Sequence, residues 1–308
     1  MAETATIDRL GHRGDGIVDE GGQQLFVPFT LPGERVEFDR DGERAELLRV
    51  LEPSADRIEP VCRHFGVCGG CQLQHLAAAP YLDFKRSLVA HAFEQRGIDA
   101  VIDPTIAVPI AGRRRVVFAA RKIKGSAVLG YSQRMSHDLI DIEECPILVP
   151  EIETVLGAFR DWVAPMVSPK GDTRITVTST TTGLDVSVES GEMPNARRIS
   201  ELALGAVPLN IARLTVHGEA LMTRAEPVIA FDGIRVTPPP GAFIQASAAS
   251  EEAMAALVIE GVGKKAKRVA DLYCGTGTFA LRLARKARVL AVEGDAKLLA
   301  VCRSLRRN

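Results

Sequence analysis

The fold of the carboxyl-terminal part is decided by the stretch Val269-Ala270-Asp271-Leu272-Tyr273-Cys274-Gly275-Thr276-Gly277-Thr278-Phe279. Residues 268–272 predict a buried strand, and the two glycines that follow predict a tight turn. We expect a helix over 278–287 and a second strand over 289–292. A strand, a glycine-rich turn, a helix and a second strand form a βαβ unit, which builds parallel sheets.

A turn of this type is suited to a cofactor, because glycines let a ligand approach the backbone and a helix N-terminus offers free N–H donors. Gly275-x-Gly277-x-x-Ala280 fits the dinucleotide pattern, and Glu293 after the second strand could accept hydrogen bonds from ribose hydroxyls. Asp271 separates the alternatives. Its carboxylate would repel a pyrophosphate but would pair with the amino group of S-adenosylmethionine. The residues therefore favour S-adenosylmethionine over a dinucleotide, with a plain βα turn as the third interpretation.

Three of the six cysteines, Cys62, Cys68 and Cys71, lie within ten residues. Clustered cysteines in a reducing compartment are metal ligands more often than disulfides. The Gly69-Gly70 pair predicts a backbone that wraps closely around a ligand, and Cys145 is the candidate fourth ligand. Zinc and a [4Fe–4S] cluster both accept four thiolates, so the spacing alone favours neither. A site closed by four cysteines would serve structure or electron transfer.

The rest of the chain predicts two further kinds of structure. Four short strands, over 5–10, 24–29, 34–39 and 43–51, suit a small barrel of the oligonucleotide-binding type. Farther on we expect helices over 80–96 and 151–163 and a hairpin around Thr182-Gly183. A helix over 250–259, with Ser250 as its N-cap, precedes the βαβ unit.

The 308 residues have an ordinary globular composition, with 46% hydrophobic residues, 25% charged residues and a net charge of −1. No apolar run approaches the roughly 20 residues that span a bilayer, and no secretory signal opens the chain, so we expect a cytoplasmic protein without membrane contact. Residues 113–124 hold six basic residues and no acid. This run predicts either a solvated face or a strip that contacts phosphates. From Lys264 onward basic residues outnumber acidic ones.

Taken together, the motifs resemble those of the bacterial RNA (uracil-5-)-methyltransferases that carry an N-terminal TRAM domain and a [4Fe–4S] cluster. The resemblance extends over about residues 1–295 and departs at Ser247, where many relatives have Asn. The matching segments occur in the family's order: Cys62-x5-Cys68-Gly-Gly-Cys71-Gln72-Leu73-Gln74-His75-Leu76, Glu144-Cys145-Pro146-Ile147-Leu148, Gly241-Ala242-Phe243-Ile244-Gln245 and Asp271–Phe279.

The resemblance implies an α/β plus β architecture in three domains. Residues 1–58 would form an OB-like TRAM barrel that binds RNA, residues 59–237 a central α+β domain with the cluster, and residues 238–308 the start of a Rossmann-like methyltransferase domain. The implied cluster ligands are Cys62, Cys68, Cys71 and Cys145. The implied S-adenosylmethionine pocket is lined by Gln245, Tyr273, Thr278 and Glu293 and shaped by Asp271, Gly275 and Gly277.

In the family, a cysteine thiolate adds to carbon 6 of uracil, and a general base later removes the proton from carbon 5. Both groups lie well after the second strand of the cofactor domain, whereas only fifteen residues follow Glu293 here. We therefore expect an incomplete, truncated methyltransferase domain, and no catalytic residue is assigned. Cys274 and Cys302 are expected to be small buried residues rather than the nucleophile.

The implied partner is ribosomal RNA, with transfer RNA as the alternative, and we expect a monomer. Two other functions stay open. One is a non-catalytic RNA-binding protein that keeps the Fe–S cluster, and the other is a nicotinamide-dependent oxidoreductase.

Overall fold

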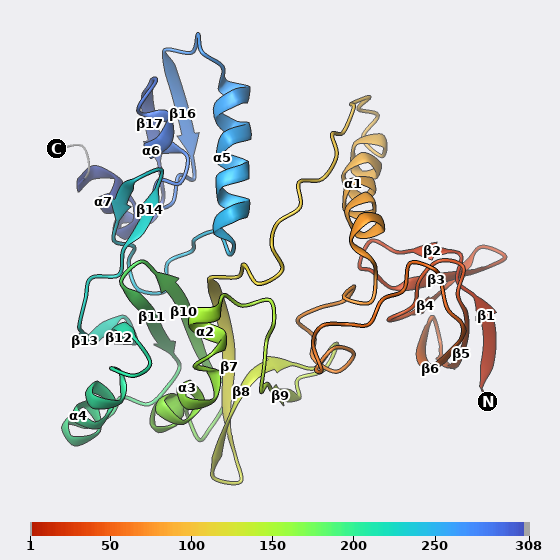
Figure 1. The fold of residues 1–308 in the computed structure, drawn as a ribbon, viewed down its shortest axis with the longest axis horizontal. Helices are drawn as coiled ribbons and strands as arrows, with labels where there is room; N and C mark the ends of the chain where they lie inside the picture. The colour runs from red at the N-terminus through yellow and green to blue at the C-terminus, as the bar shows by residue number, and fades with distance from the viewer. Residues whose placement is uncertain (1, 305–308) are drawn as a thin grey trace. The chain divides into compact units, whose positions relative to one another are not determined.

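A computed structural model describes residues 2–304, which divide into two compact units (Figure 1). Unit 1 comprises Met1–Ala107 and Ser132–Asp138, and unit 2 comprises Val108–Tyr131 and Leu139–Asn308. The three-domain division expected from the sequence stays a prediction. Among the described residues, no helix is long and apolar enough to cross a membrane.

Unit 1 is built on a six-stranded sheet with the order β1-β5-β6-β4-β3-β2. A single strand is expected over 5–10, but this segment divides into two strands: Ile7 donates to the Glu34 carbonyl and Asp8 to the Ile17 carbonyl, each at 2.9 Å. Residues 3–10 therefore supply both edge strands of the sheet, which curls as a result. The elements are β1 Glu3–Thr6, β2 Arg9–Leu10, β3 Gly16–Glu20, β4 Gln23–Val27, β5 Arg35–Asp41, β6 Arg44–Glu52 and the helix α1 Ala78–Glu94.

Helix α1 confirms the helix expected over 80–96, displaced by two residues. Pro80 lies in its first turn, where the missing N–H leaves no bond unmade. Gly97, with φ +64°, follows its end. No residue of α1 is fully buried.

Unit 2 contains a seven-stranded sheet with the order β13-β12-β11-β10-β7-β8-β9. The expected hairpin is confirmed, because β10 and β11 pair antiparallel around Thr182-Gly183. β11 then pairs in parallel with β12. The strands are β7 Arg115–Ile123, β8 Ser126–Ser132, β9 Leu139–Asp141, β10 Thr173–Thr180, β11 Gly183–Glu189, β12 Ile211–Val216 and β13 Glu219–Thr223.

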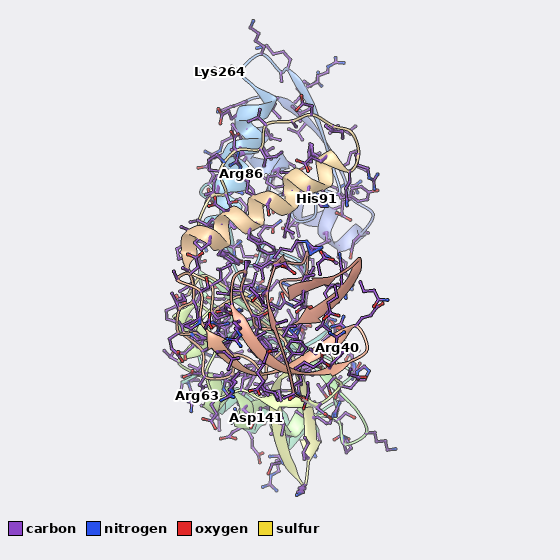
Figure 2. All side chains as sticks on the ribbon, turned by 90° about the vertical axis from the view of Figure 1, so that its right-hand side faces the viewer. Arg40, Arg63, Arg86, His91, Asp141 and Lys264 are labelled. Carbon is purple, nitrogen blue, oxygen red and sulfur yellow. The ribbon has the colours of Figure 1, made fainter. Side chains whose placement is uncertain are left out.

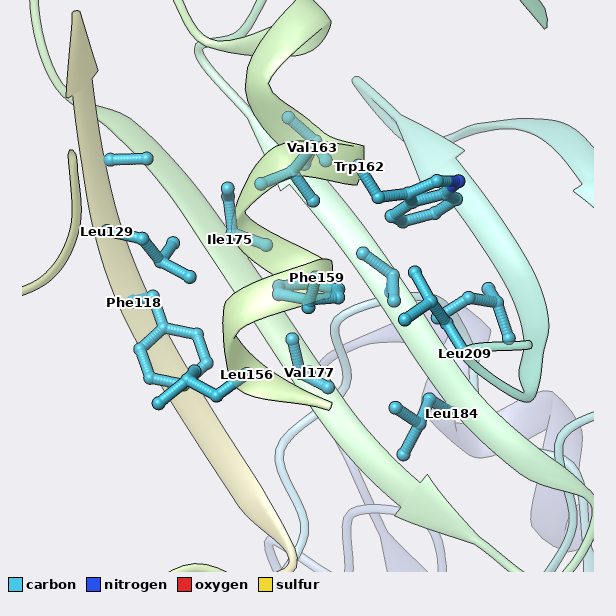
Figure 3. Packing of buried hydrophobic residues seen from close by; sticks show 14 of the residues in the cluster. Phe118, Leu129, Leu156, Phe159, Trp162, Val163, Ile175, Val177, Leu184 and Leu209 are labelled. Atoms are coloured by element: carbon cyan, nitrogen blue, oxygen red, sulfur yellow. The ribbon is translucent and has the colours of Figure 1, made fainter. Parts of the chain in front are cut away.

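Helices cover this sheet, and the hydrophobic core consists of buried side chains from the strands and the helices (Figure 3). The single helix expected over 151–163 is two helices, because Val155 leaves helical geometry at ψ 1°. Phe118 and Phe159 are buried between sheet and helix, and Trp162 donates to the Leu202 carbonyl at 2.9 Å. The elements are α2 Pro150–Glu153, α3 Leu156–Val163, the 3-10 helix η1 Ala164–Met166 and α4 Ala196–Gly205.

The expected βαβ unit is present at the end of the described chain, with β16 and β17 parallel and adjacent. Three details differ from expectation. The helix after the turn is four residues rather than ten, β16 is half-exposed rather than buried, and α5 begins at Ala248 with Ser247 as its N-cap in place of Ser250. The elements are β14 Ile229–Phe231, β15 Ile234–Val236, α5 Ala248–Val262, β16 Arg268–Leu272, α6 Ala280–Leu283, β17 Arg288–Val292 and α7 Ala296–Ser304.

Candidate cofactor site

The turn between β16 and α6 is held in the left-handed backbone region. Tyr273, Gly275 and Gly277 have φ values of +61°, +58° and +98°. A Cβ at Gly277 would lie 2.9 Å from the Cys302 sulfur, whereas a Cβ at Gly275 would meet open space. Tyr273 is 90% exposed, and because it carries a Cβ its positive φ is a strained backbone conformation. Strain of this kind is typical of ligand sites.

Asp271 is the penultimate residue of β16, just before the turn. Burial raises the pKa of its carboxyl group, and a backbone hydrogen bond from Ala280 lowers the pKa by less. Its Oδ2 atom is buried and has no hydrogen-bond partner among the described residues. A buried acceptor without a donor is costly, so this oxygen is free to receive a donor from a ligand.

Glu293 follows β17 and closes the turn against that strand. Its Oε2 accepts a hydrogen bond from the Gly275 amide at 2.8 Å and its Oε1 one from the Asp295 amide at 3.0 Å. These bonds lower the pKa of Glu293, so the carboxylate is ionised near neutral pH. Each oxygen keeps a further lone pair. The ribose contact expected for Glu293 stays a prediction.

Gln245 lies in the segment before α5, which arginines of unit 2 hold in place. The Arg114 amide donates to the Ala246 carbonyl at 2.7 Å, and its Nε donates to the Gln245 carbonyl at 3.2 Å. Arg115 Nε donates to the Ala242 carbonyl at 3.0 Å. Residues 113–124 were expected to form a solvated face or a strip that contacts phosphates. Neither expectation fits Arg114 and Arg115, because their side chains are partly buried and donate to backbone carbonyls.

A buried carboxylate joins this segment to the turn. Glu251, in the first turn of α5, binds Arg114 Nη2 at 2.7 Å and Arg282 Nη2 at 3.2 Å. Arg282 Nη1 donates to the Thr278 carbonyl at 2.8 Å. The triad Arg114–Glu251–Arg282 thus fixes the Gln245 segment relative to the glycine-rich turn. The sequence analysis missed it, although an arginine within the apolar stretch Ala280–Ala284 was a signal.

The cysteine-rich loop belongs to unit 1, whereas Cys145 is buried in unit 2. Burial raises the pKa of the Cys68 thiol, and the nearby Cys71 and Cys62 raise it further. Within residues 2–304, no three His, Cys, Asp or Glu side chains stand around one point as ligands of a single ion. The expectation that both glycines of the Gly69-Gly70 pair make room for a ligand is wrong at Gly69. A Cβ there would lie 2.7 Å from the Ser132 carbonyl oxygen, so the backbone of residue 132 excludes a side chain.

Cys274 and Cys302 are buried beside the turn. Burial raises the pKa of both thiols, that of Cys302 to about 12. Nucleophilic addition requires the thiolate, so neither residue is suited to that role.

A cavity of about 990 Å³ lies over β16 and β17 beside α6 and α7, and Leu281, Leu290 and Leu299 contribute to its apolar lining. None of the seven residues expected to bind the cofactor lines it. Five of the seven residues, Asp271, Gly275, Gly277, Thr278 and Glu293, instead lie at the glycine-rich turn. Tyr273 also belongs to this turn, but its side chain is exposed to solvent.

Comparison with protein-family models gives no match. An uncharacterized RNA methyltransferase of Rhizobium meliloti is 45% identical over 298 residues, covering 95% of this chain and 72% of that protein. The 23S rRNA (uracil(1939)-C(5))-methyltransferase RlmD of Aeromonas salmonicida is 31% identical over 311 residues, covering 96% and 71%. The crystal structure of a Pyrococcus abyssi tRNA (uracil-54, C5)-methyltransferase with S-adenosyl-L-homocysteine has a TM-score of 0.71 at 20% identity, covering 98% and 75%.

Proposed function

The chain belongs to the RNA methyltransferases, and from this premise we propose that it uses S-adenosylmethionine to form 5-methyluridine in RNA. The observation that carries the proposal is the buried Asp271 oxygen without a partner, next to a turn with open space at Gly275. A carboxylate in this position is suited to the ammonium group of the methyl donor. A dinucleotide has no ammonium group, and its anionic pyrophosphate would be repelled by this carboxylate.

The residues of the turn would hold the donor, whose sulfonium supplies an electrophilic methyl group. In this proposal Asp271 binds the amino group, and Gly275 and Gly277 allow close approach to the backbone. Glu293 and Gln245 bind the nucleoside part, and Thr278 and Tyr273 complete the pocket. The triad Arg114–Glu251–Arg282 positions Gln245 against the turn. No residue is assigned the nucleophile or the base.

Ribosomal RNA is the proposed substrate, because the Aeromonas relative named for 23S rRNA is 31% identical along most of this chain. The tRNA enzyme is similar in fold alone, at 20% identity. The test is transfer of a labelled methyl group from S-adenosylmethionine to unmodified 23S rRNA and to unmodified tRNA. Label in 23S rRNA at uracil carbon 5 supports the proposal, and label in tRNA alone refutes the choice of substrate.

The runner-up is a non-catalytic Fe–S protein that binds RNA. It predicts RNA binding and donor binding without methyl transfer under any condition tested. The nicotinamide-dependent oxidoreductase is eliminated if calorimetry gives heat with S-adenosylmethionine and none with NAD or NADP.

A [4Fe–4S] cluster on Cys62, Cys68, Cys71 and Cys145 is the proposed metal group. The chemistry of the donor set supports it, since the thiols of Cys71 and Cys62 lie near that of Cys68. A single zinc ion needs all four sulfurs at about 2.3 Å, whereas a cluster takes one thiolate at each iron and so accepts wider spacing.

We expect anaerobically purified protein to be brown and to contain iron and sulfide. Cys68→Ser should bleach it and lower the thermal stability of unit 1, whereas Cys274→Ser should leave the colour unchanged. Stoichiometric zinc in colourless wild-type protein would refute the cluster.

A further inference from the structure

One edge of unit 2 carries six basic side chains that have no ion pair among the described residues. All six are exposed: Lys264, Lys265, Lys267, Arg268, Lys286 and Arg288. We call this set the basic edge. Three members lie on the loop between α5 and β16, and Figure 2 shows Lys264 at the tip of that loop. Arg268 and Arg288 are the first residues of β16 and β17.

The basic edge costs the fold electrostatic energy. Arg268 and Arg288 are direct partners in the parallel strand pair, so their side chains leave the sheet on the same face. Like charges placed side by side on neighbouring strands are destabilising. Within residues 2–304 no acidic side chain forms an ion pair with them, although the whole chain has a net charge of −1. Nearby Arg285, by contrast, is paired with Asp232 at 2.5 Å. An unrelieved cluster of this kind is typical of a surface that binds an anion with many charges.

We propose that the basic edge binds phosphates of the RNA substrate, an inference that rests on the proposed function. RNA presents phosphates in a row, and lysine and arginine gain affinity by releasing its counterions. Residues 1–58, which the resemblance implies bind RNA, are a poor source of this attraction, because they include thirteen acidic and seven basic residues.

The position of the basic edge also suits a substrate strand. It lies at the amino-terminal ends of β16 and β17, whereas the glycine-rich turn lies at the carboxyl end of β16. Four steps of about 3.3 Å along β16 separate the two ends, so the distance is roughly 13 Å. A strand whose target base reaches the turn would therefore place phosphates a few nucleotides away on the basic edge.

The test measures binding of an oligouridine RNA by fluorescence anisotropy as a function of salt concentration, with the full chain. The edge variant carries Lys264→Gln, Lys265→Gln and Lys267→Gln. The matched control carries Lys85→Gln, Lys170→Gln and Arg197→Gln, three exposed residues outside both the basic edge and the 113–124 run, which change the net charge by the same amount. In the edge variant, the slope of log K against log salt should become shallower by about 2, since each single-strand contact contributes about 0.7. Affinity near 0.1 M salt should fall roughly tenfold or more, with the control close to wild type.

Each other outcome has a defined meaning. If wild type and control bind RNA and the edge variant has the same slope, the inference is wrong while the proposed function stands. Equal losses in both variants would show a diffuse attraction and also overturn it. If wild type binds phosphatidylserine vesicles but no RNA at low salt, both the inference and the proposed function fail. Unchanged calorimetric binding of S-adenosylmethionine shows that the edge variant is folded.

Discussion

Asp271 is the residue at which stability and ligand binding oppose each other. An ionised carboxylate with a buried, unpartnered oxygen destabilises the folded chain, because water is removed and no donor replaces it. The sequence predicts Asp271 as a site residue from its place at the end of a strand, just before the glycine-rich turn. It does not predict the missing partner, which depends on how α6 and β17 pack around the carboxyl group.

Asp271→Asn should weaken S-adenosylmethionine binding by roughly 10- to 100-fold, since a charge-assisted hydrogen bond is lost. The folded-state pKa lies above the unfolded value of about 3.9, so the folded chain binds the proton more tightly. Stability is therefore greatest below that value and declines as pH rises through the raised pKa. The variant should lack this decline. Calorimetric titration and denaturant unfolding at several pH values test both effects.

The control for this prediction is Asp172→Asn, which removes an exposed carboxylate paired with Arg121. It should leave donor binding unchanged. Donor binding by Asp271→Asn equal to wild type would remove Asp271 from the pocket.

His75 shows the opposite dependence on pH. It is fully buried against Phe65, with ring centroids 5.3 Å apart, and burial lowers its pKa to about 4. The unfolded chain has the usual histidine pKa near 6.5, so it binds the proton first as pH falls. Stability is full above that value and is lost as pH falls toward about 4.

Replacing this side chain by phenylalanine, His75→Phe, should flatten that loss, which amounts to roughly 3 kcal/mol at about 1.4 kcal/mol per pKa unit. Unfolding of unit 1 in denaturant at pH 7 and pH 4.5 measures it. His91→Phe replaces an exposed histidine and should keep the wild-type dependence. Parallel pH profiles for wild type and His75→Phe would contradict the assignment.

At the scale of elements, the triad Arg114–Glu251–Arg282 shows what sequence patterns omit. By sequence alone, an acidic residue in the first turn of α5 would be assigned to a favourable interaction with the helix dipole. Glu251 instead is 1% exposed in its side chain and joins α5 to Arg114, directly before β7, and to Arg282 of α6. The same applies to α6, which is four residues long although the sequence predicts a helix of ten. Period and composition predict that helices exist, whereas contacts between distant segments set where they end.

Glu251→Gln should lower the free energy of unfolding by about 3–5 kcal/mol, because two partly or fully buried arginines lose their common counter-charge. Glu252 provides a matched control, since it also contacts Arg282 but its side chain is 59% exposed. Glu252→Gln should cost at most about 1 kcal/mol. Chemical denaturation measures both values. Equal effects would show that Glu251 is not the central member.

For the whole molecule, local sequence patterns predict the small barrel-like sheet of unit 1, the β10–β11 hairpin of unit 2 and the βαβ unit. It does not predict that Ser132–Asp138 belongs to unit 1. This segment lies against the cysteine loop, where the Gly69 amide donates to the Ser132 carbonyl at 3.0 Å. Such pairing of distant segments carries no local signature.

Residues 98–110 lack regular structure and expose apolar side chains, with Val101 91% exposed. We expect limited proteolysis to cut there. The two fragments should elute together in gel filtration, since residues 132–138 stay packed on unit 1. Gly69→Ala should weaken their association, because its Cβ would clash with the Ser132 carbonyl. Separate elution of wild-type fragments would contradict this arrangement.

The return of Ser132–Asp138 to unit 1 has a consequence for biosynthesis. The amino-terminal sheet leaves the ribosome early, yet its cysteine loop lacks a neighbouring backbone until residue 138 has emerged. At roughly 5–20 residues per second, the thirty or so residues after 107 delay completion by about 2–6 seconds. During that interval the Gly69 amide lacks its Ser132 acceptor, and Cys145, the proposed fourth ligand, emerges only afterwards, so the cluster can be completed only once the returning segment has been made.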